Sequence, residues 1–338
     1  LIGACNPYRK REKNKEKYGL SKTDDNDYEL VYLVHPLPYS LLYYVFSFGS
    51  INDQDEKKYI RSIIERLFTK EEKVLHESTT EVISQCHIYL RNLFDPSEVS
   101  LREIERFSKC IEFFKEYYYK KNKYLNRINN ENNNKLRSII CSIYICYYVR
   151  LTGEKKRTNF DVELRPRLLQ LINNGQNIEE KGENLIEQIK ISEFKNEILK
   201  NNEKIEFFSD FLRIEEEFLL AQIELDKGIG KNILLKENVF LLFLSLTTNI
   251  PLIIIGKPGT GKSLSTQLIY KSMKGKYSKN KFFQLFPKII QIYFQGSESI
   301  EPEDVENLFD KSKKILNKIK ENELLKEKGE NPEEIPII

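Results

Sequence analysis

The sequence of 338 residues is long enough for two or three domains of ordinary size, and its hydrophobic content of 40% is that of a folded globular protein. Its 54 Lys and Arg residues nearly balance 51 Asp and Glu residues, which leaves a formal net charge of only +3. Proteins dedicated to nucleic-acid binding usually carry a larger basic excess, so this balance argues against nucleic acid as a partner.

Cysteine and histidine residues indicate neither a metal site nor a disulfide framework. Five Cys and three His residues are scattered along the chain, without the spacing of zinc ligands. An odd number of cysteines is typical of reduced thiols inside the cell, so we expect a cytoplasmic protein. No apolar run reaches the roughly 18 residues that a transmembrane segment needs.

Both ends of the chain have the pattern of an interrupted strand. The chain starts at Leu1 instead of Met, inside an apolar run over 1–5, and finishes in another apolar run over 335–338. We therefore expect a fragment of a longer protein.

Helical periodicity dominates the chain up to about residue 250. After a short strand predicted over 29–34, apolar residues at helical spacing predict helices over 40–48, 53–68, 81–93, 100–119, 136–149, 205–225 and 235–247. The helix from Ser100 begins with an N-cap, and Glu103 occupies the capping-box position. Residues 153–202 are rich in Lys, Glu and Asn, which indicates surface helices with loops, and 173–182 is the best candidate for a mobile insert.

Aromatic residues are concentrated in several of these helices. They could form a groove for a partner, but packing in the core explains them more simply. The residues are Tyr43, Tyr44, Phe113, Phe114, Tyr117, Tyr118 and Tyr119.

The character of the sequence changes after residue 250. The continuous apolar run over 251–255 predicts a buried strand, and 289–294 predicts another. Helices are predicted over 262–274 and, rich in Lys and Glu, over 304–328.

The residues between the first of these strands and its helix match a phosphate-binding motif. They fit G-x-x-x-x-G-K-[ST] at every fixed position, as Gly256, Lys257, Pro258, Gly259, Thr260, Gly261, Lys262 and Ser263. Glycines let backbone N–H groups surround phosphate oxygens, and the following helix directs its positive end toward the same charge. A glycine-rich hairpin is the structural alternative, but it needs a strand on both sides and explains neither Lys262 nor Ser263. We therefore predict a site for ATP or GTP, with ATP favoured.

The motif predicts distinct roles for its last two residues. Lys262 would bridge the β- and γ-phosphate oxygens, and the Ser263 hydroxyl would bind Mg²⁺. Hydrolysis also requires a Walker B strand that ends in an acid, whereas the strand over 289–294 is followed by Gln295-Gly296-Ser297. Residues 335–338 could open such a strand. The chain is therefore predicted to hold half of a catalytic site.

Several stretches around this motif match one family together. They are Lys231-Asn232, Leu235-Lys236-Glu237-Asn238, Ile250-Pro251-Leu252 and Gly256-Lys257-Pro258-Gly259, continued by Leu264 and Gln295. In these stretches the chain resembles the mysterin family. Its members are giant dynein-like AAA+ ATPases that also have a RING-type ubiquitin-ligase half. The resemblance implies that Leu264 joins residues 256–263 in binding the nucleotide. Many members have a serine where this chain has Gly261.

The N-terminal part resembles the second half of a preceding AAA+ module. Residues 3–9 resemble a sensor 1 strand, in which Asn6 would orient the attacking water, and residues 34–42 resemble the entry to a helical lid. Residues 100–106 resemble a sensor 2 helix, in which Arg102 would reach the γ-phosphate of the upstream nucleotide. Taken alone, Asn6 fits a turn and Arg102 a solvated helix end; their order ahead of a P-loop favours the functional interpretation. The arginine finger is not identified.

The resemblance implies a helix-rich α/β fold, with parts of the αβα sandwich of an AAA+ P-loop NTPase and an α-helical lid. Residues 1–150 would be the C-terminal half of an upstream module and 151–230 a helical connection. Residues 231–338 would be the N-terminal half of the next module, cut before Walker B.

The implied function is ATP binding with Mg²⁺, and in the intact protein ATP hydrolysis, by the core of an E3 ubiquitin-protein ligase. Partners would be ATP, neighbouring AAA+ modules and, through a region absent from this chain, the ubiquitin machinery; zinc is expected only in that region. A stand-alone P-loop NTPase or kinase is one alternative, although no Asn-Lys-x-Asp motif of GTPases is present. A helical scaffold that binds a nucleotide without turnover is another.

Overall fold

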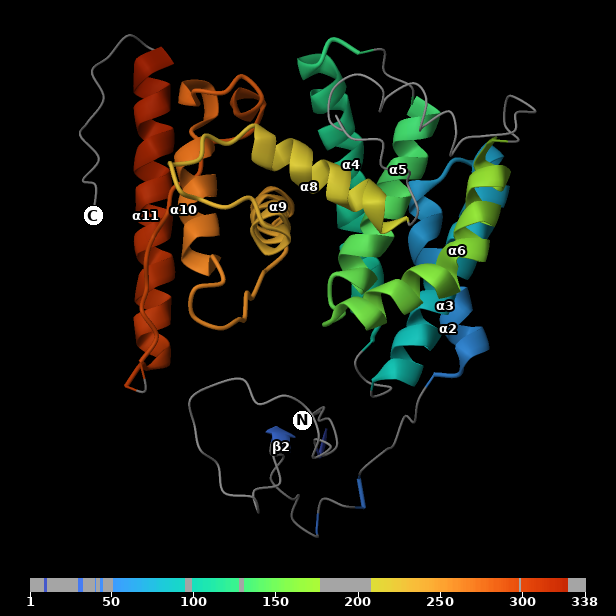
Figure 1. The fold of residues 1–338 in the computed structure, drawn as a ribbon. Helices are drawn as coiled ribbons and strands as arrows, with labels where there is room; N and C mark the ends of the chain where they lie inside the picture. Colours follow the sequence, from blue (N-terminus) through green and yellow to red (C-terminus); the bar gives the residue numbers. More distant parts are fainter. Residues whose placement is uncertain are drawn as a thin grey trace. The chain divides into compact units, whose positions relative to one another are not determined.

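The structure is a computed structural model that describes residues 9–10, 30–32, 40, 43–44, 51–94, 99–127, 131–176, 208–297 and 299–327 (Figure 1). Asn6, the strand predicted over 1–5, the residues at 335–338 and most of the helix predicted over 40–48 lie outside the described residues. The chain divides into two compact units, and the boundary between Ile269 and Tyr270 falls inside one helix.

The described residues of the first unit are mostly helical. Its two short strands, β1 (Arg9–Lys10) and β2 (Leu30–Tyr32), pair antiparallel, and β2 lies within the strand predicted over 29–34. The helices are α2 (Asp53–Ile64), α3 (Lys73–Leu93), α4 (Arg102–Tyr124), α5 (Glu131–Ile143), α6 (Glu154–Gln176), α8 (Ser209–Ala221), α9 (Ile233–Thr248) and α10 (Lys262–Ser272). Short 3₁₀ turns, η1 (Glu65–Leu67) and η2 (Lys70–Glu72), join α2 to α3, and a π-helical turn, η4 (Tyr144–Tyr148), continues α5.

The second unit holds the end of α10 and three further elements. Two 3₁₀ turns, η5 (Gly275–Tyr277) and η6 (Phe283–Leu285), lead to the long helix α11 (Pro302–Glu327). Phe282, Phe283 and Phe286 are buried together in this unit.

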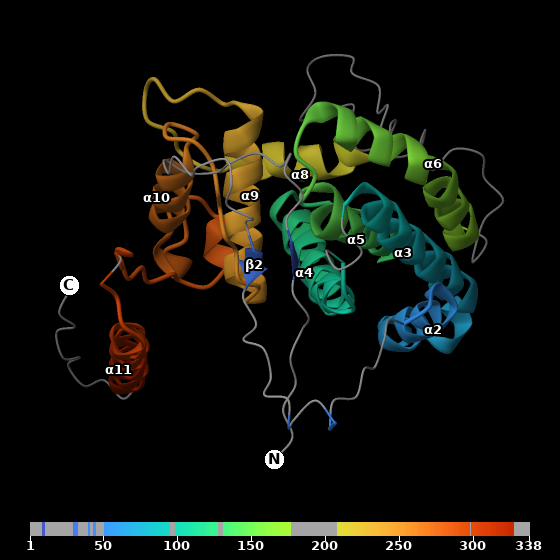
Figure 2. The same cartoon turned by 90° about the horizontal axis from the view of Figure 1, so that it is seen from below.

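In the first unit, helices pack in antiparallel or crossing pairs along their apolar faces. α3 packs against α2 and α6, α4 against α5, and α8 against α9 (Figures 1 and 2). An aromatic cluster fills the contact between α4 and α9, where Phe114 stacks on Phe240 and Phe113 meets Phe243 edge to face. The interpretation of the aromatic residues as core is confirmed for Phe113, Phe114, Tyr117 and Tyr118, whereas Tyr43, Tyr44 and Tyr119 are exposed.

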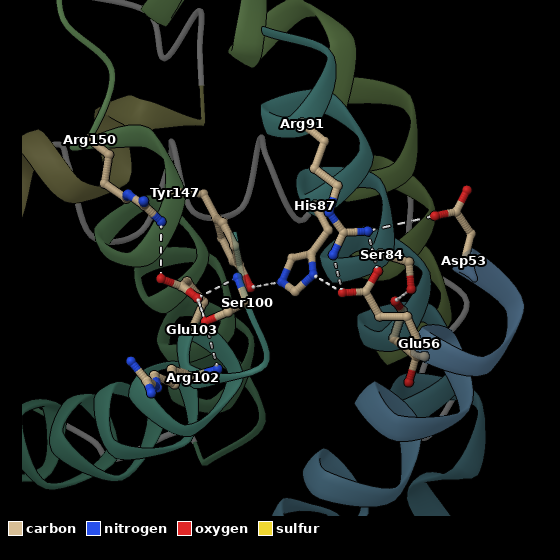
Figure 3. A network of polar contacts seen from close by, with 11 residues as sticks. Asp53, Glu56, Ser84, His87, Arg91, Ser100, Arg102, Glu103, Tyr147 and Arg150 are labelled. Atoms are coloured by element: carbon tan, nitrogen blue, oxygen red, sulfur yellow. Dashed lines mark hydrogen bonds and ion pairs between the residues drawn. The ribbon is translucent and has the colours of Figure 1, made fainter. Parts of the chain in front are cut away.

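A buried polar network joins α2, α3 and the π turn (Figure 3). The His87 ring is fully buried; its Nδ1 lies 3.0 Å from Glu56 Oε1, and its Nε2 lies 3.0 Å from the Tyr147 hydroxyl. Arg91 donates to both oxygens of the Glu56 carboxylate. Burial alone would raise the pKa of Glu56, but the bonds from His87 and Arg91 lower it to about 2. Buried polar groups are stable where such bonds satisfy them.

The helices predicted between residues 53 and 247 are confirmed. The predicted helices over 53–68, 81–93, 100–119, 136–149, 205–225 and 235–247 all correspond to observed helices, and α3 and α5 begin earlier than predicted. The prediction of surface helices over 153–202 is confirmed for α6, which is exposed along one face, while Phe160, Leu164 and Leu168 on its other face are fully buried. The mobile insert predicted from residue 173 is wrong at its start, since α6 continues to Gln176.

The strands predicted over 251–255 and 289–294 are not formed in the described part of the chain. Ile253 and Ile255 are 83% and 71% exposed, and beside the second run the structure has only an isolated bridge from Lys274 to Lys288. A parallel strand needs at least one neighbouring strand to pair with, and a buried one needs cover on both faces of its sheet. The helix-rich character of the fold is therefore confirmed, whereas the αβα sandwich is not seen in the described residues.

No helix in the described ranges is long and apolar enough to cross a membrane.

Candidate nucleotide-binding loop

The predicted phosphate-binding loop lies between the extended run over 251–255 and α10, and its turns depend on glycine. Gly259 and Gly261 have φ angles of +82° and +80°, a region in which side chains other than hydrogen are strained. Between them, the Thr260 hydroxyl donates to the Lys257 carbonyl over 2.8 Å and closes a tight turn. The backbone thus adopts the conformation for which the motif requires its glycines.

Gly256 is required for a different reason, which is space. A Cβ atom at this position would lie 2.9 Å from Thr260 Oγ1 and 3.8 Å from Lys262 Nζ. The loop therefore folds so closely over its first residue that a side chain there would displace Thr260. All three glycines of the motif are consequently explained by the geometry.

Lys262 folds back over the loop that precedes it. Its Nζ donates to the carbonyl oxygens of Gly256 and Lys257 over 2.5 and 2.7 Å, and it lies 3.3 Å from Thr260 Oγ1. The ammonium group is thereby held at the mouth of the loop, in contact with neutral carbonyls and without an acidic partner among the described residues. A cation in such surroundings remains available to an anion that enters the loop.

The first turn of α10 supplies the remaining features of an anion site. The Ser265 N–H and hydroxyl both donate to the Gly261 carbonyl over 2.8 Å, so the helix is regular from the end of the loop. Ser263 is exposed on this first turn, and Leu264 is half-buried behind it. Residues 238–269 contain no Asp or Glu, so the local charge and the helix dipole both favour a negative ligand. Residues 256–263 therefore fit a nucleotide phosphate, and Ser263 is the residue that could bind its magnesium.

Arg102, the predicted sensor 2 residue, is the first residue of α4 and is exposed (Figure 3). Its backbone N–H lies 3.3 Å from Ser100 Oγ, while Glu103 accepts from the N–H and the hydroxyl of Ser100 over 2.9 Å each. Arg106 and Arg150 also donate to Glu103. In the part of the chain that the structure describes, Arg102 makes no hydrogen bond or ion pair with the loop at 256–263, so the structure does not join these predicted site residues.

One contact near the loop was not predicted from the sequence. Arg157 of α6 and Glu237 of α9 form a two-bonded ion pair, with distances of 2.7 and 3.0 Å. The residues lie 80 positions apart, so no local pattern pairs them. The signal that could have drawn attention to Glu237 is its place in the apolar helix 233–248, where a carboxylate needs a partner.

Comparisons with known proteins identify relatives of this chain. Residues 228–327 match the family model described as the RNF213 AAA domain. The chain is 29% identical over 338 residues to E3 ubiquitin-protein ligase RNF213 of Homo sapiens and 28% identical over 330 residues to E3 ubiquitin-protein ligase rnf213-beta of Danio rerio. Each match covers 91% of this chain and 6% of the relative. The chain thus spans about 6% of the length of the curated relatives it matches. These matches confirm the resemblance to the giant AAA+ ligases.

Proposed function

We propose that this chain is a member of the RNF213 family and binds ATP through residues 256–263 as a part of the AAA+ core of a larger E3 ubiquitin-protein ligase. The observation that carries the proposal is the loop geometry, in which Gly259 and Gly261 have positive φ and the Lys262 ammonium folds back onto the loop carbonyls. The match of residues 228–327 to an AAA domain supports it independently.

The backbone and two side chains of the loop would take part in binding. Backbone N–H groups from Gly259 to Ser263 would bind phosphate oxygens, and the Lys262 ammonium would exchange its carbonyl partners for the β- and γ-phosphates. The Ser263 hydroxyl would hold Mg²⁺, which neutralises charge on the phosphates. Because the loop carbonyls already hold the Lys262 ammonium in place, less side-chain entropy is lost when the phosphate binds.

The rest of a hydrolytic site would come from other parts of the protein. In this proposal residues 1–150 belong to an upstream AAA+ module, in which Asn6 and Arg102 act on that module's nucleotide. Residues 151–230 connect it to the module that opens at 231. Ubiquitin transfer and the zinc that it needs would reside in other parts of the full-length protein. This chain matches only about 6% of the length of its relatives.

Turnover of ATP by the full-length protein tests the proposal. Substitution Lys262→Ala removes a charge-assisted bond to phosphate, so we expect turnover at limiting ATP to fall by about 10- to 100-fold at this site. Lys276→Ala, which removes an exposed lysine from η5, is the matched control and should leave turnover unchanged.

Two other outcomes would favour the alternatives. Unchanged turnover in Lys262→Ala would make this chain a scaffold with respect to hydrolysis. Turnover by residues 1–338 alone, at the rate of the full-length protein, would favour a stand-alone NTPase over an excised part of a larger core.

A further inference from the structure

An ion pair joins α6, which precedes the candidate loop by about a hundred residues, to α9, which leads into the loop. Arg157 donates from both terminal nitrogens to Glu237, with NH2 to Oε1 at 2.7 Å and NH1 to Oε2 at 3.0 Å. Parallel bonds of this kind fix the relative orientation of the two groups as well as their distance. Glu237 is 8% exposed, so water competes little for its carboxylate.

The other edges of the Arg157 guanidinium are bound as well. Its Nε donates to the Leu151 carbonyl over 2.9 Å, and NH2 also donates to the Val149 carbonyl over 3.3 Å. The guanidinium carbon lies 5.1 Å from the centre of the Tyr148 ring, the last residue of the π turn. Arg157 therefore ties the end of the π turn to Glu237 in a single orientation, which lysine could not reproduce.

Residues near both ends of α9 contact the candidate loop or the segment that leads into it. At the first end, the Leu235 side chain is buried and its Cδ1 lies 3.7 Å from the position of a Cβ on Gly261. At the other end, the Ser245 hydroxyl donates to the Ile250 carbonyl over 2.6 Å and fixes the chain that runs into the loop. A displacement of α9 would therefore move Gly261 at the end of the loop and Ile250 in the segment that leads into it.

From these contacts we propose that Arg157 is a positioning residue for the nucleotide site: through Glu237 and α9 it sets the loop at 256–263 in its binding conformation and links it to the π turn and α6. The inference rests on the proposed function, because it assigns Arg157 and Glu237 to the loop that binds a nucleoside triphosphate. Arg157 itself does not touch the nucleotide. Its effect on binding passes through Glu237, Leu235 and Gly261.

Equilibrium binding of a fluorescent ATP analogue to the full-length protein tests the inference. Arg157→Lys keeps the charge but loses the paired bonds, and Glu237→Gln keeps the shape but loses the charge. Each should weaken binding at the Lys262-dependent site by about 3- to 10-fold. The double variant should be no weaker than either single variant, because both remove the same link.

A second readout is independent of nucleotide. Hydrogen exchange of the amides of 256–263 in the nucleotide-free protein should be faster in both variants than in the wild type, because α9 no longer holds the loop. Arg91→Lys is the matched control, since Arg91 makes a similar two-bonded pair with Glu56 that does not reach α9. It should lower thermal stability without changing analogue affinity or exchange at 256–263.

The outcomes separate this inference from the function on which it rests. Affinity within about twofold of wild type in Arg157→Lys and Glu237→Gln, or a loss no larger than that of Arg91→Lys, would overturn the positioning role. If Lys262→Ala itself leaves binding of the analogue unchanged, the proposed function fails. If only Lys262→Ala weakens binding, the function stands and the positioning role does not.

Discussion

At the residue scale, single glycines determine the conformation of the candidate phosphate-binding loop. Gly261 has a φ of +80°, and the nearest atom to a Cβ placed there is Leu235 Cδ1 at 3.7 Å, which is an ordinary contact. Space is therefore available for a methyl group at Gly261, whereas the backbone conformation is not open to alanine without strain. The residue before Lys262 is glycine because of its φ angle.

We predict that Gly261→Ala weakens ATP binding by about 5- to 30-fold, since an L-residue in the left-handed region costs about 1–2 kcal/mol. The loop would relax from this strain by leaving its binding conformation. Titration with ATP measures the effect. Gly230→Ala is the control, because Gly230 has no positive φ and no atom within 4 Å of a Cβ. Equal affinity in the two variants would contradict this account of the loop.

Glu216 on α8 is a buried carboxyl group beside the Arg157–Glu237 pair. Burial, and after it the neighbouring Glu237 carboxylate, raise its pKa from 4.5 to about 8, against the opposing effect of Arg157 and Lys236. Its pKa is thus higher in the folded protein than in the unfolded chain. The folded state consequently loses stability as pH rises from 4.5 toward 8, because Glu216 must then ionise in a buried place.

We predict that Glu216→Gln raises the free energy of unfolding at pH 8 by about 1–3 kcal/mol and leaves it nearly unchanged at pH 5. The amide reproduces the shape of the protonated acid without the ionisation. Urea unfolding of wild type and variant at both pH values provides the comparison. A variant that is less stable than wild type at pH 8 would show that the ionised carboxylate makes a favourable interaction.

At the scale of elements, helices were predictable where local signals mark their ends. Ser100 and Glu103 predicted the start of α4 to within one residue: the N-cap is Leu101 instead of Ser100, and the Glu103 carboxylate accepts from the Ser100 N–H and hydroxyl. α10 begins at Lys262, as the motif requires. The many charged residues of α6 predict its exposed face, but they and Pro166 obscure the stripe of Phe160, Leu164 and Leu168 that packs inward.

The two predicted strands are not formed in the described residues because strand pairing depends on partners that the local sequence does not reveal. A run such as 251–255 is apolar at every position, which suits a strand covered on both faces. Its partners must come from elsewhere, and in the described residues Ile253 and Ile255 remain exposed. Composition identifies a segment that can enter a sheet, but the pairing depends on residues far along the chain.

We predict that Glu103→Gln lowers the stability of the α4 end by about 1–2 kcal/mol. The amide weakens the bonds to Ser100 and loses the ion pairs with Arg106 and Arg150. Hydrogen exchange of the first-turn amides of α4 should become correspondingly faster. Glu105→Gln, an exposed acid of the same turn, should change exchange little. Identical exchange in both variants would mean that the capping contact contributes no stability.

At the scale of the whole molecule, the contacts that organise the site were beyond prediction. The residues proposed to bind phosphate form one continuous segment, so the motif alone identifies them. The ion pair of Arg157 and Glu237 joins residues 80 positions apart. The buried pair of Lys121 and Glu215 joins residues 94 positions apart. Such pairs follow from tertiary packing, and a sequence of average charge gives no reason to single out their members.

The most direct test of the central claim is the number of ATP molecules bound per chain of the full-length protein. Equilibrium dialysis at saturating ATP and Mg²⁺ compares wild type with Lys262→Ala, whose fold is checked by its unfolding temperature. Since the account places one nucleotide at residues 256–263, it predicts that the variant binds one ATP fewer than wild type at concentrations that saturate the wild-type protein. An unchanged stoichiometry and affinity in a folded variant would contradict it.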